Sequence, residues 1–188
     1  KLNKIGGTAT AKLDWDSLST SGLSLASLDI DETLDLHVDG GVGFDALSGT
    51  VVGKGSFSLD LGQVSTTAAN GSGSISFTDA DAVSLTLTDI TLFAGVGGSL
   101  NPGTTPTDYS DDTVDYGTVG FGGSLTGQMR LVAINDSGKT YLGVETDAAA
   151  LSADLIGFTG LLEFHVYDGT LKLNKIGGTA TAKLDWDS

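Results

Sequence analysis

Residues 124–145, SLTGQMRLVAINDSGKTYLGVE, hold two runs of alternating apolar and polar side chains around the turn sequence Asn-Asp-Ser-Gly at 135–138. Side chains along a β-strand point to opposite faces in turn, so alternation with period two predicts a strand with one packed face. Asn, Asp and Gly tolerate the positive φ angles that a tight hairpin requires. This stretch therefore predicts an antiparallel β-hairpin.

The same alternation recurs along the chain, for example over residues 8–16, 56–61 and 161–167, with further turns predicted at 70–73 and 167–170. The parity of the apolar positions changes near residues 26–27, 88–89 and 174–178. A parity change predicts an irregularity, because one residue must be absorbed to keep the same face buried. We expect an all-β fold, an antiparallel β-sandwich or flattened barrel of roughly eight to ten strands repeated head to tail. A β-solenoid is the alternative.

An exact repeat organises the chain. Residues 1–17 read KLNKIGGTATAKLDWDS, and residues 172–188 carry the same 17 letters. Such a repeat indicates a tandem array or a polymer, and an engineered duplication is the other origin. We therefore divide the chain into one period, residues 1–171, and the start of the next identical period, residues 172–188. The repeat junction is predicted at the parity change, which comprises Asn174, Lys175, Ile176, Gly177 and Gly178, followed by a strand equivalent to residues 8–16.

Composition narrows the classes of partner. The chain has 188 residues, a formal net charge of −15 and no cysteine. A polyanion repels nucleic acids and anionic lipid surfaces, and without cysteine neither disulfides nor thiolate metal sites can form. No apolar run reaches the roughly 18 residues of a spanning helix. We therefore expect no nucleic-acid partner and no membrane-spanning segment.

The longest predicted loop, residues 101–115, contains both prolines and four aspartates. Ca²⁺ takes six to eight oxygen ligands, which clustered carboxylates and carbonyls can supply. A Ca²⁺ site there is one interpretation and a solvated acidic loop is the other. The candidate metal ligands are Asp108, Asp111, Asp112 and Asp115.

Catalytic signatures are missing from the sequence. The chain has two histidines and no cysteine, and it contains no nucleophile elbow, phosphate-binding loop or metalloprotease helix motif. Carboxylates are numerous, but no pair is set at a spacing that predicts a glycosidase site. We therefore predict no catalytic residues and do not expect an enzyme.

Three runs of sequence are similar to those of a known class of protein, namely SFSLDLGQVS at 56–65, SLTLTDITLFAGVGGSL at 84–100 and LEFHVYDGTLKLNK at 162–175. Together with the long repeat, the acidic charge and the missing cysteine, they resemble the repeat regions of giant bacterial cell-surface or secreted adhesin-like proteins. No short motif indicates a named family, and no functional residue is carried over.

The resemblance implies an extracellular location and a structural repeat unit of a filament or surface stalk. Its partners would be identical neighbouring repeats or subunits, joined by β-stacking or strand sharing. The alternative that stays open is an adhesin module that binds Ca²⁺ or a glycan on a cell surface, with residues 101–115 as the contact.

Overall fold

The computed structural model describes residues 1–18, 28–70, 73–105 and 107–186. These residues contain nine β-strands and no helix. The strands are β1 (Leu34–Ala46), β2 (Val51–Ala69), β3 (Ser74–Val96), β4 (Ser99–Asn101), β5 (Thr113–Asp115), β6 (Val119–Asp136), β7 (Lys139–Ile156), β8 (His165–Gly169) and β9 (Lys172–Gly178).

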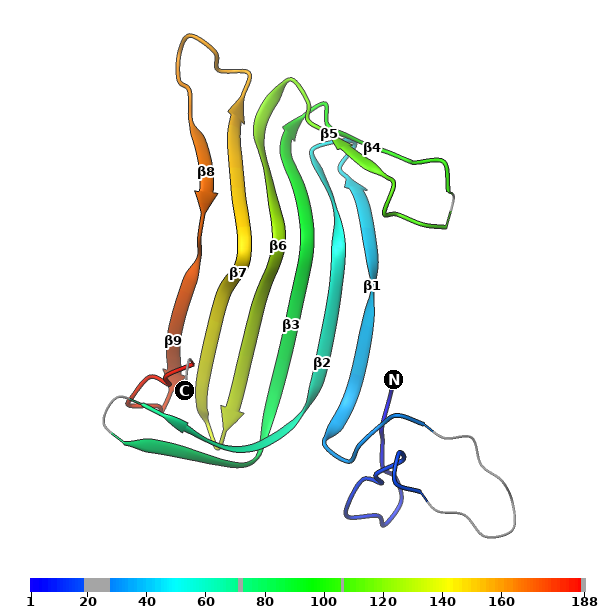
Figure 1. Cartoon of the computed structure of the whole chain (residues 1–188), viewed down its shortest axis with the longest axis vertical. Coiled ribbons are helices and arrows are strands. Elements are labelled where there is room, and N and C mark those ends of the chain that lie inside the picture. Colours follow the sequence, from blue (N-terminus) through cyan, green and yellow to red (C-terminus); the bar gives the residue numbers. More distant parts are fainter. Residues whose placement is uncertain (19–27, 71–72, 106, 187–188) are drawn as a thin grey trace.

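Seven strands form one antiparallel sheet in the order β1-β2-β3-β6-β7, with β8 and β9 both paired to the outer edge of β7 (Figure 1). β4 and β5 form a separate small hairpin at one corner. The expected all-β antiparallel fold is confirmed. The sheet is not closed into a barrel, so of the two expected forms the structure is consistent with a sandwich.

A bend in the longest hairpin creates a second layer at one end of the sheet. The register of β2 against β3 shifts between Val64 and Thr66, and Asp79 has φ 50°. The Ser65 hydroxyl donates to Asp79 Oδ1 at 3.0 Å and accepts from the Asp79 amide at 2.9 Å. Because bulges sharpen the bend of a strand pair, the far end of the hairpin runs across β6, β7 and β9 (Figure 1).

The main core lies between this bent hairpin and the sheet. The aromatic rings of Phe77 and Tyr141 meet edge to face, with centroids 5.4 Å apart. The buried cluster comprises Phe77, Ala80, Ile134, Tyr141 and Leu184. Since Leu184 belongs to the second copy of the 17-residue repeat, that copy completes the core of the unit.

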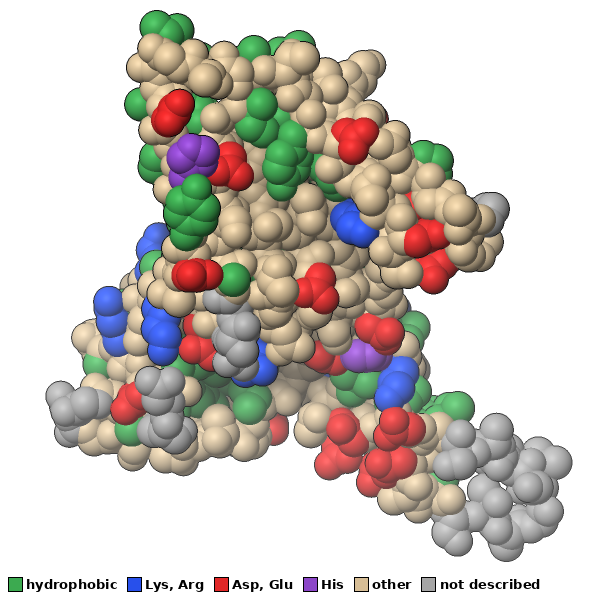
Figure 2. Space-filling view, turned by 45° about the horizontal axis from the view of Figure 1, so that its top comes forward, with side chains coloured by type: hydrophobic (Ala, Val, Ile, Leu, Met, Phe, Trp, Pro, Cys, Tyr) green, Lys and Arg blue, Asp and Glu red, His purple; other side chains and the backbone are tan. Residues whose placement is uncertain are grey.

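Much of the remaining sheet is a single layer. The chain exposes 11623 Å² at 19.0 kDa, whereas a compact monomer of that mass exposes about 8,400 Å². Apolar side chains lie open on the surface among acidic ones (Figure 2). The unit therefore leaves apolar area uncovered that a neighbouring body could bury.

Several predicted turns and irregularities are confirmed. The turn at 135–138 joins β6 to β7, with positive φ at Ser137 and Gly138. The centre of the turn predicted at 70–73, residues 71 and 72, lies outside the described residues. The irregularity at 88–89 is a register shift with Asp89 at φ 50°. The one predicted at 26–27 lies outside the described residues. The hairpin turn predicted at 167–170 is wrong, because β8 and β9 follow one another along the same edge of β7.

Candidate functional site

The two copies of the 17-residue repeat lie at opposite edges of the same sheet. The first copy contacts β1, where Leu2 pairs antiparallel with Leu36. The second copy forms β9, which pairs antiparallel with β7. The two termini accordingly lie on opposite sides of the sheet in Figure 1. One sequence therefore makes two different strand pairings.

The first copy uses one hydrogen-bonding edge of its backbone. The Lys1 carbonyl accepts from the His37 amide at 2.9 Å, and the α-amino nitrogen of Lys1 donates to the His37 carbonyl at 2.7 Å. The Asn3 amide donates to the Asp35 carbonyl at 3.0 Å. The backbone polar groups of Lys1 and Asn3 thus face β1.

The second copy uses the other edge. The Leu171 carbonyl accepts from the Thr146 amide at 2.9 Å, and the pairing then runs from Lys172–Glu145 to Gly178–Lys139 without a shift. Backbone groups along a strand point to alternate sides. The polar groups of Leu171 therefore face β7, and those of Lys172 and Asn174, the equivalents of Lys1 and Asn3, face away from it.

The predicted repeat junction therefore lies in a regular strand. Asn174, Lys175, Ile176 and Gly177 pair without interruption, and only Gly178, at the end of β9, has a positive φ of 62°. The irregularity predicted over 174–178 is wrong except for that last residue. The apolar parity changes within β9 because Leu173 lies on the exposed face of the strand, whereas Ile176 lies on the opposite face and packs against the core cluster.

The strand predicted over residues 8–16 is also wrong. In both copies the chain turns at a glycine, Gly7 with φ 64° or Gly178 with φ 62°, and then folds back as an irregular segment. The Asn3 amide group donates to the Leu13 carbonyl at 2.8 Å, and that of Asn174 donates to the Leu184 carbonyl at 2.7 Å. These side-chain hydrogen bonds satisfy backbone carbonyls that would otherwise accept from a neighbouring strand, so they compete with strand pairing.

The asparagine site is complete only in the first copy. Buried Asn3 also donates to the Asp31 carbonyl at 2.7 Å, and its Oδ1 accepts from Trp15 Nε1 at 3.0 Å. In the second copy the indole of Trp186 lies over Gly143, and its buried Nε1 has no hydrogen-bond partner among the described residues. A buried donor without a partner is unfavourable. The second site therefore lacks the acceptor that the first site provides for its tryptophan.

Charge differs between the two edges. Lys1 Nζ lies 2.7 Å from Asp29 Oδ2, and Lys12 Nζ lies 2.5 Å from Asp35 Oδ1 as an ion pair without hydrogen-bond geometry. Of their equivalents, Lys183 is exposed, and Lys172 is exposed and lies 3.8 Å from Glu145. Basic side chains gather at the lower left of Figure 2, on the side of β9, and acidic ones at the lower right, on the side of β1.

The four candidate metal ligands lie in or beside the loop between β4 and β5. Asp111 Oδ2 accepts from the amides of Thr104 and Thr105, and buried Asp112 accepts from the Gly103 amide at 2.9 Å. Asp108 bonds the Ser110 amide, and Asp115 accepts from Asn101 Nδ2. Within the described residues no three His, Cys, Asp or Glu side chains gather to hold a metal ion.

His37 sits at the edge that the first copy covers. Its Nδ1 lies 2.6 Å from Asp60 Oδ1 on β2, and its Nε2 lies 2.9 Å from Asp39 Oδ1. The hydrogen bond with Asp60, followed by that with Asp39, raises the pKa of His37, although partial burial opposes the shift. The alternation of the sequence puts His37 and Asp39 on one face, but Asp60 becomes a partner only through the pairing of β1 with β2.

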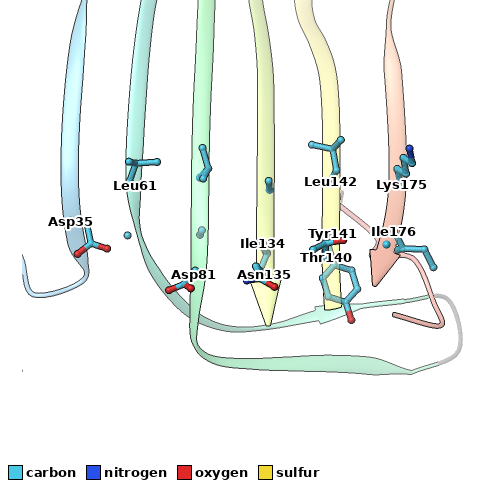
Figure 3. Close-up of a pocket in the computed structure, with 15 residues that line it drawn as sticks. Asp35, Leu61, Asp81, Ile134, Asn135, Thr140, Tyr141, Leu142, Lys175 and Ile176 are labelled. Atoms are coloured by element: carbon cyan, nitrogen blue, oxygen red, sulfur yellow. The ribbon is translucent and has the colours of Figure 1, made fainter. Parts of the chain in front are cut away.

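An open groove of about 640 Å³ crosses one end of the sheet (Figure 3). Its side chains come from six strands, with Asp35 of β1 at one end and Lys175 of β9 at the other. The groove therefore runs between the two edges that carry the repeated segment. Sequence reasoning missed it because it depends on strand order.

The comparisons with known proteins give no relative: no family model, curated protein or solved structure matches the chain. The described part of the chain contains no helix long and apolar enough to cross a membrane. Interpretation of the two edges therefore depends on their geometry. The division into a period of residues 1–171 and a following copy stays a prediction.

Proposed function

We propose that this chain is a structural repeat unit of an extracellular bacterial filament or surface stalk, in which neighbouring units join through the edges of their sheets. The observation that carries the proposal is the placement of one 17-residue sequence at both edges of the sheet. A unit that presents the same segment at its two ends is suited to head-to-tail repetition.

Three further features support this role. Among the described residues no strand pairs with the outward edge of β9 or with β1 beyond residue 37, and an open edge is a template for pairing with another chain. The exposed surface is larger than a compact monomer of this mass would have. The net charge of −15 would keep a long polymer soluble. The resemblance to bacterial surface repeats supports the extracellular setting.

The proposal is tested with chains of one, two and three periods, each ending in the 17-residue segment. Repeat proteins whose units stack on their neighbours gain stability with each added unit. We expect the melting temperature to rise with period number and the maximum dimension in small-angle X-ray scattering to grow by a constant increment. An unchanged melting temperature, with globular particles in electron micrographs, would argue against a stalk.

A further inference from the structure

We propose that the outward edge of β9 binds the β1 edge of a second copy of this unit, so that one strand is shared by two sheets. In this register Lys172 lies opposite His37 of the second copy and Asn174 lies opposite Asp35. The inference rests on the proposed function and adds to it the contact surface and the residue pairing.

The backbone geometry allows one strand to serve both units. Lys1 and Asn3 direct their polar groups to β1, whereas Leu171 directs its groups to β7. In the second copy the backbone polar groups of Lys172 and Asn174 face away from β7. In the first copy the equivalent groups bind β1. Both pairings are antiparallel, so the alternating strand direction continues from one sheet into the next.

Burial in the two copies is complementary. Leu184 is 3% exposed against the core of its unit, whereas the equivalent Leu13 is 52% exposed. Asn3 is buried beside β1, whereas the equivalent Asn174 is half-buried. The first copy therefore buries its asparagine and the second copy buries its leucine. A segment shared by two units would bury both residues.

The partnerless indole of Trp186 indicates the same missing neighbour. In the first copy Asn3 is held between the carbonyls of Leu13 and Asp31, which leaves its Oδ1 to accept from Trp15. In the second copy Asn174 binds only the Leu184 carbonyl among these partners. A second unit would bring its Asp31 carbonyl to Asn174, which orients the amide oxygen toward Trp186.

Side chains also match across the proposed contact. Apolar Leu173 would lie opposite Leu36, and exposed Leu171 opposite exposed Val38. Exposed large apolar residues occur along β8 and β9 and in the segments that adjoin them, namely Leu161, Leu162, Phe164, Tyr167, Leu171 and Leu173. Since β1 exposes Val38, Val42 and Phe44, the two edges can cover one another.

Charge complementarity acts in the same direction. Lys1 and Lys12 of the first copy lie beside Asp29 and Asp35. Their equivalents on the second copy, Lys172 and Lys183, are exposed and would meet the same aspartates of the neighbouring unit. Attraction between unlike charges steers this association. Repulsion between like charges disfavours the alternative contact between two acidic edges.

Separate chains must exchange strands to make this contact, because the first copy already covers residues 35–37 of β1. Asn3→Ala should loosen that cover, since Asn3 makes three side-chain hydrogen bonds there. The matched control is Asn174→Ala. It leaves residues 1–3 paired with β1 and weakens the second copy, which would bind β1 of another chain. We expect Asn3→Ala to increase head-to-tail association in sedimentation velocity and Asn174→Ala not to increase it.

The register is tested by disulfide trapping, because the chain has no native cysteine. Full-length Asn3→Ala chains carrying Leu173→Cys are mixed under mild oxidation with Asn3→Ala chains carrying Leu36→Cys. The pair corresponds to Leu2–Leu36, which lies between hydrogen-bonded pairs, and the Cα separation of about 4.5 Å there suits a disulfide. We expect at least about tenfold more linked dimer than with His37→Cys, whose side chain points to the other face.

Circular dichroism must first show folded chains, and Lys12→Ala replaces Asn3→Ala if the latter unfolds. Equal linking at Leu36→Cys and His37→Cys overturns the register. The absence of linked dimer also overturns it, provided that Leu2→Cys and Leu36→Cys within one chain do form a disulfide. If tandem chains gain stability with each period although this dimer does not form, the units stack without sharing a strand. In that case the inference fails and the proposed function stands.

Discussion

Leu13 and Leu184 occupy the same position of two identical 17-residue segments, yet Leu13 is 52% exposed and Leu184 is 3% exposed. Leu184 belongs to the core cluster with Phe77 and Tyr141. The difference therefore arises from the edge of the sheet on which each copy lies and not from the sequence around the leucine.

This difference predicts unequal effects of one substitution at the two positions. Leu184→Ala should lower the free energy of unfolding by about 2–4 kcal/mol, because it leaves a cavity in the core. Leu13→Ala should change it by less than about 0.5 kcal/mol, as is usual at exposed positions. Urea denaturation of the two variants and the parent checks this. Equal losses would show that the two copies have equivalent surroundings.

Gly143 provides space for Trp186. A Cβ built on Gly143 would lie 2.7 Å from the indole, so Gly143→Ala should displace Trp186 and destabilise the fold by about 1–3 kcal/mol. In a Trp15→Phe background the fluorescence of Trp186 should shift to longer wavelength. Gly40→Ala is the control, because its Cβ would meet no atom within 4 Å. An unshifted spectrum in Gly143→Ala would refute the packing.

His37 should make stability depend on pH. Its pKa is raised in the folded state, mainly by Asp60, so folding favours the protonated ring. This stabilisation is complete below the unfolded pKa of about 6.5 and is lost as the pH rises through the higher folded pKa. Between pH values of about 6 and 9 the melting temperature should fall more in the parent than in His37→Asn. Parallel profiles would rule out a contribution from His37.

Calcium should have little effect on the melting temperature, because the carboxylates of the acidic loop at 101–115 already have hydrogen-bond partners. Asp111 and Asp112 already accept hydrogen bonds from backbone amides, and the Lys54 ammonium donates to the carbonyls of Ser110 and Asp112. We expect calorimetric melting temperatures with about 1 mM Ca²⁺ and with EDTA to agree within about one degree. A calcium-dependent rise would instead support the Ca²⁺-binding adhesin alternative.

Local pattern was sufficient to predict the strands and several of their irregularities. The β6–β7 hairpin was predicted from alternation around residues 135–138, and the bulge at Asp89 from a change of parity. These features depend on neighbouring residues, whose side-chain directions the period of a strand dictates.

The same rule failed for residues 8–16 for a physical reason. In the second copy, residues 180, 182, 184 and 186 are buried or half-buried and the residues between them are exposed, as a strand pattern requires. The segment nevertheless packs against the core without forming a strand. Alternating burial needs only an extended chain on an apolar surface, and it does not specify a hydrogen-bonded neighbour.

Alternation and turn residues were enough to establish the all-β class and the positions of several strands, and the letters alone show that one segment occurs twice. The three-dimensional arrangement was needed to learn that the two copies bind opposite edges of one sheet, and that Asp60 reaches His37. A β-strand has two equivalent hydrogen-bonding edges, and its side-chain pattern does not say which neighbour uses which edge. Strand order settles that choice, and strand order depends on contacts between residues far apart in the chain.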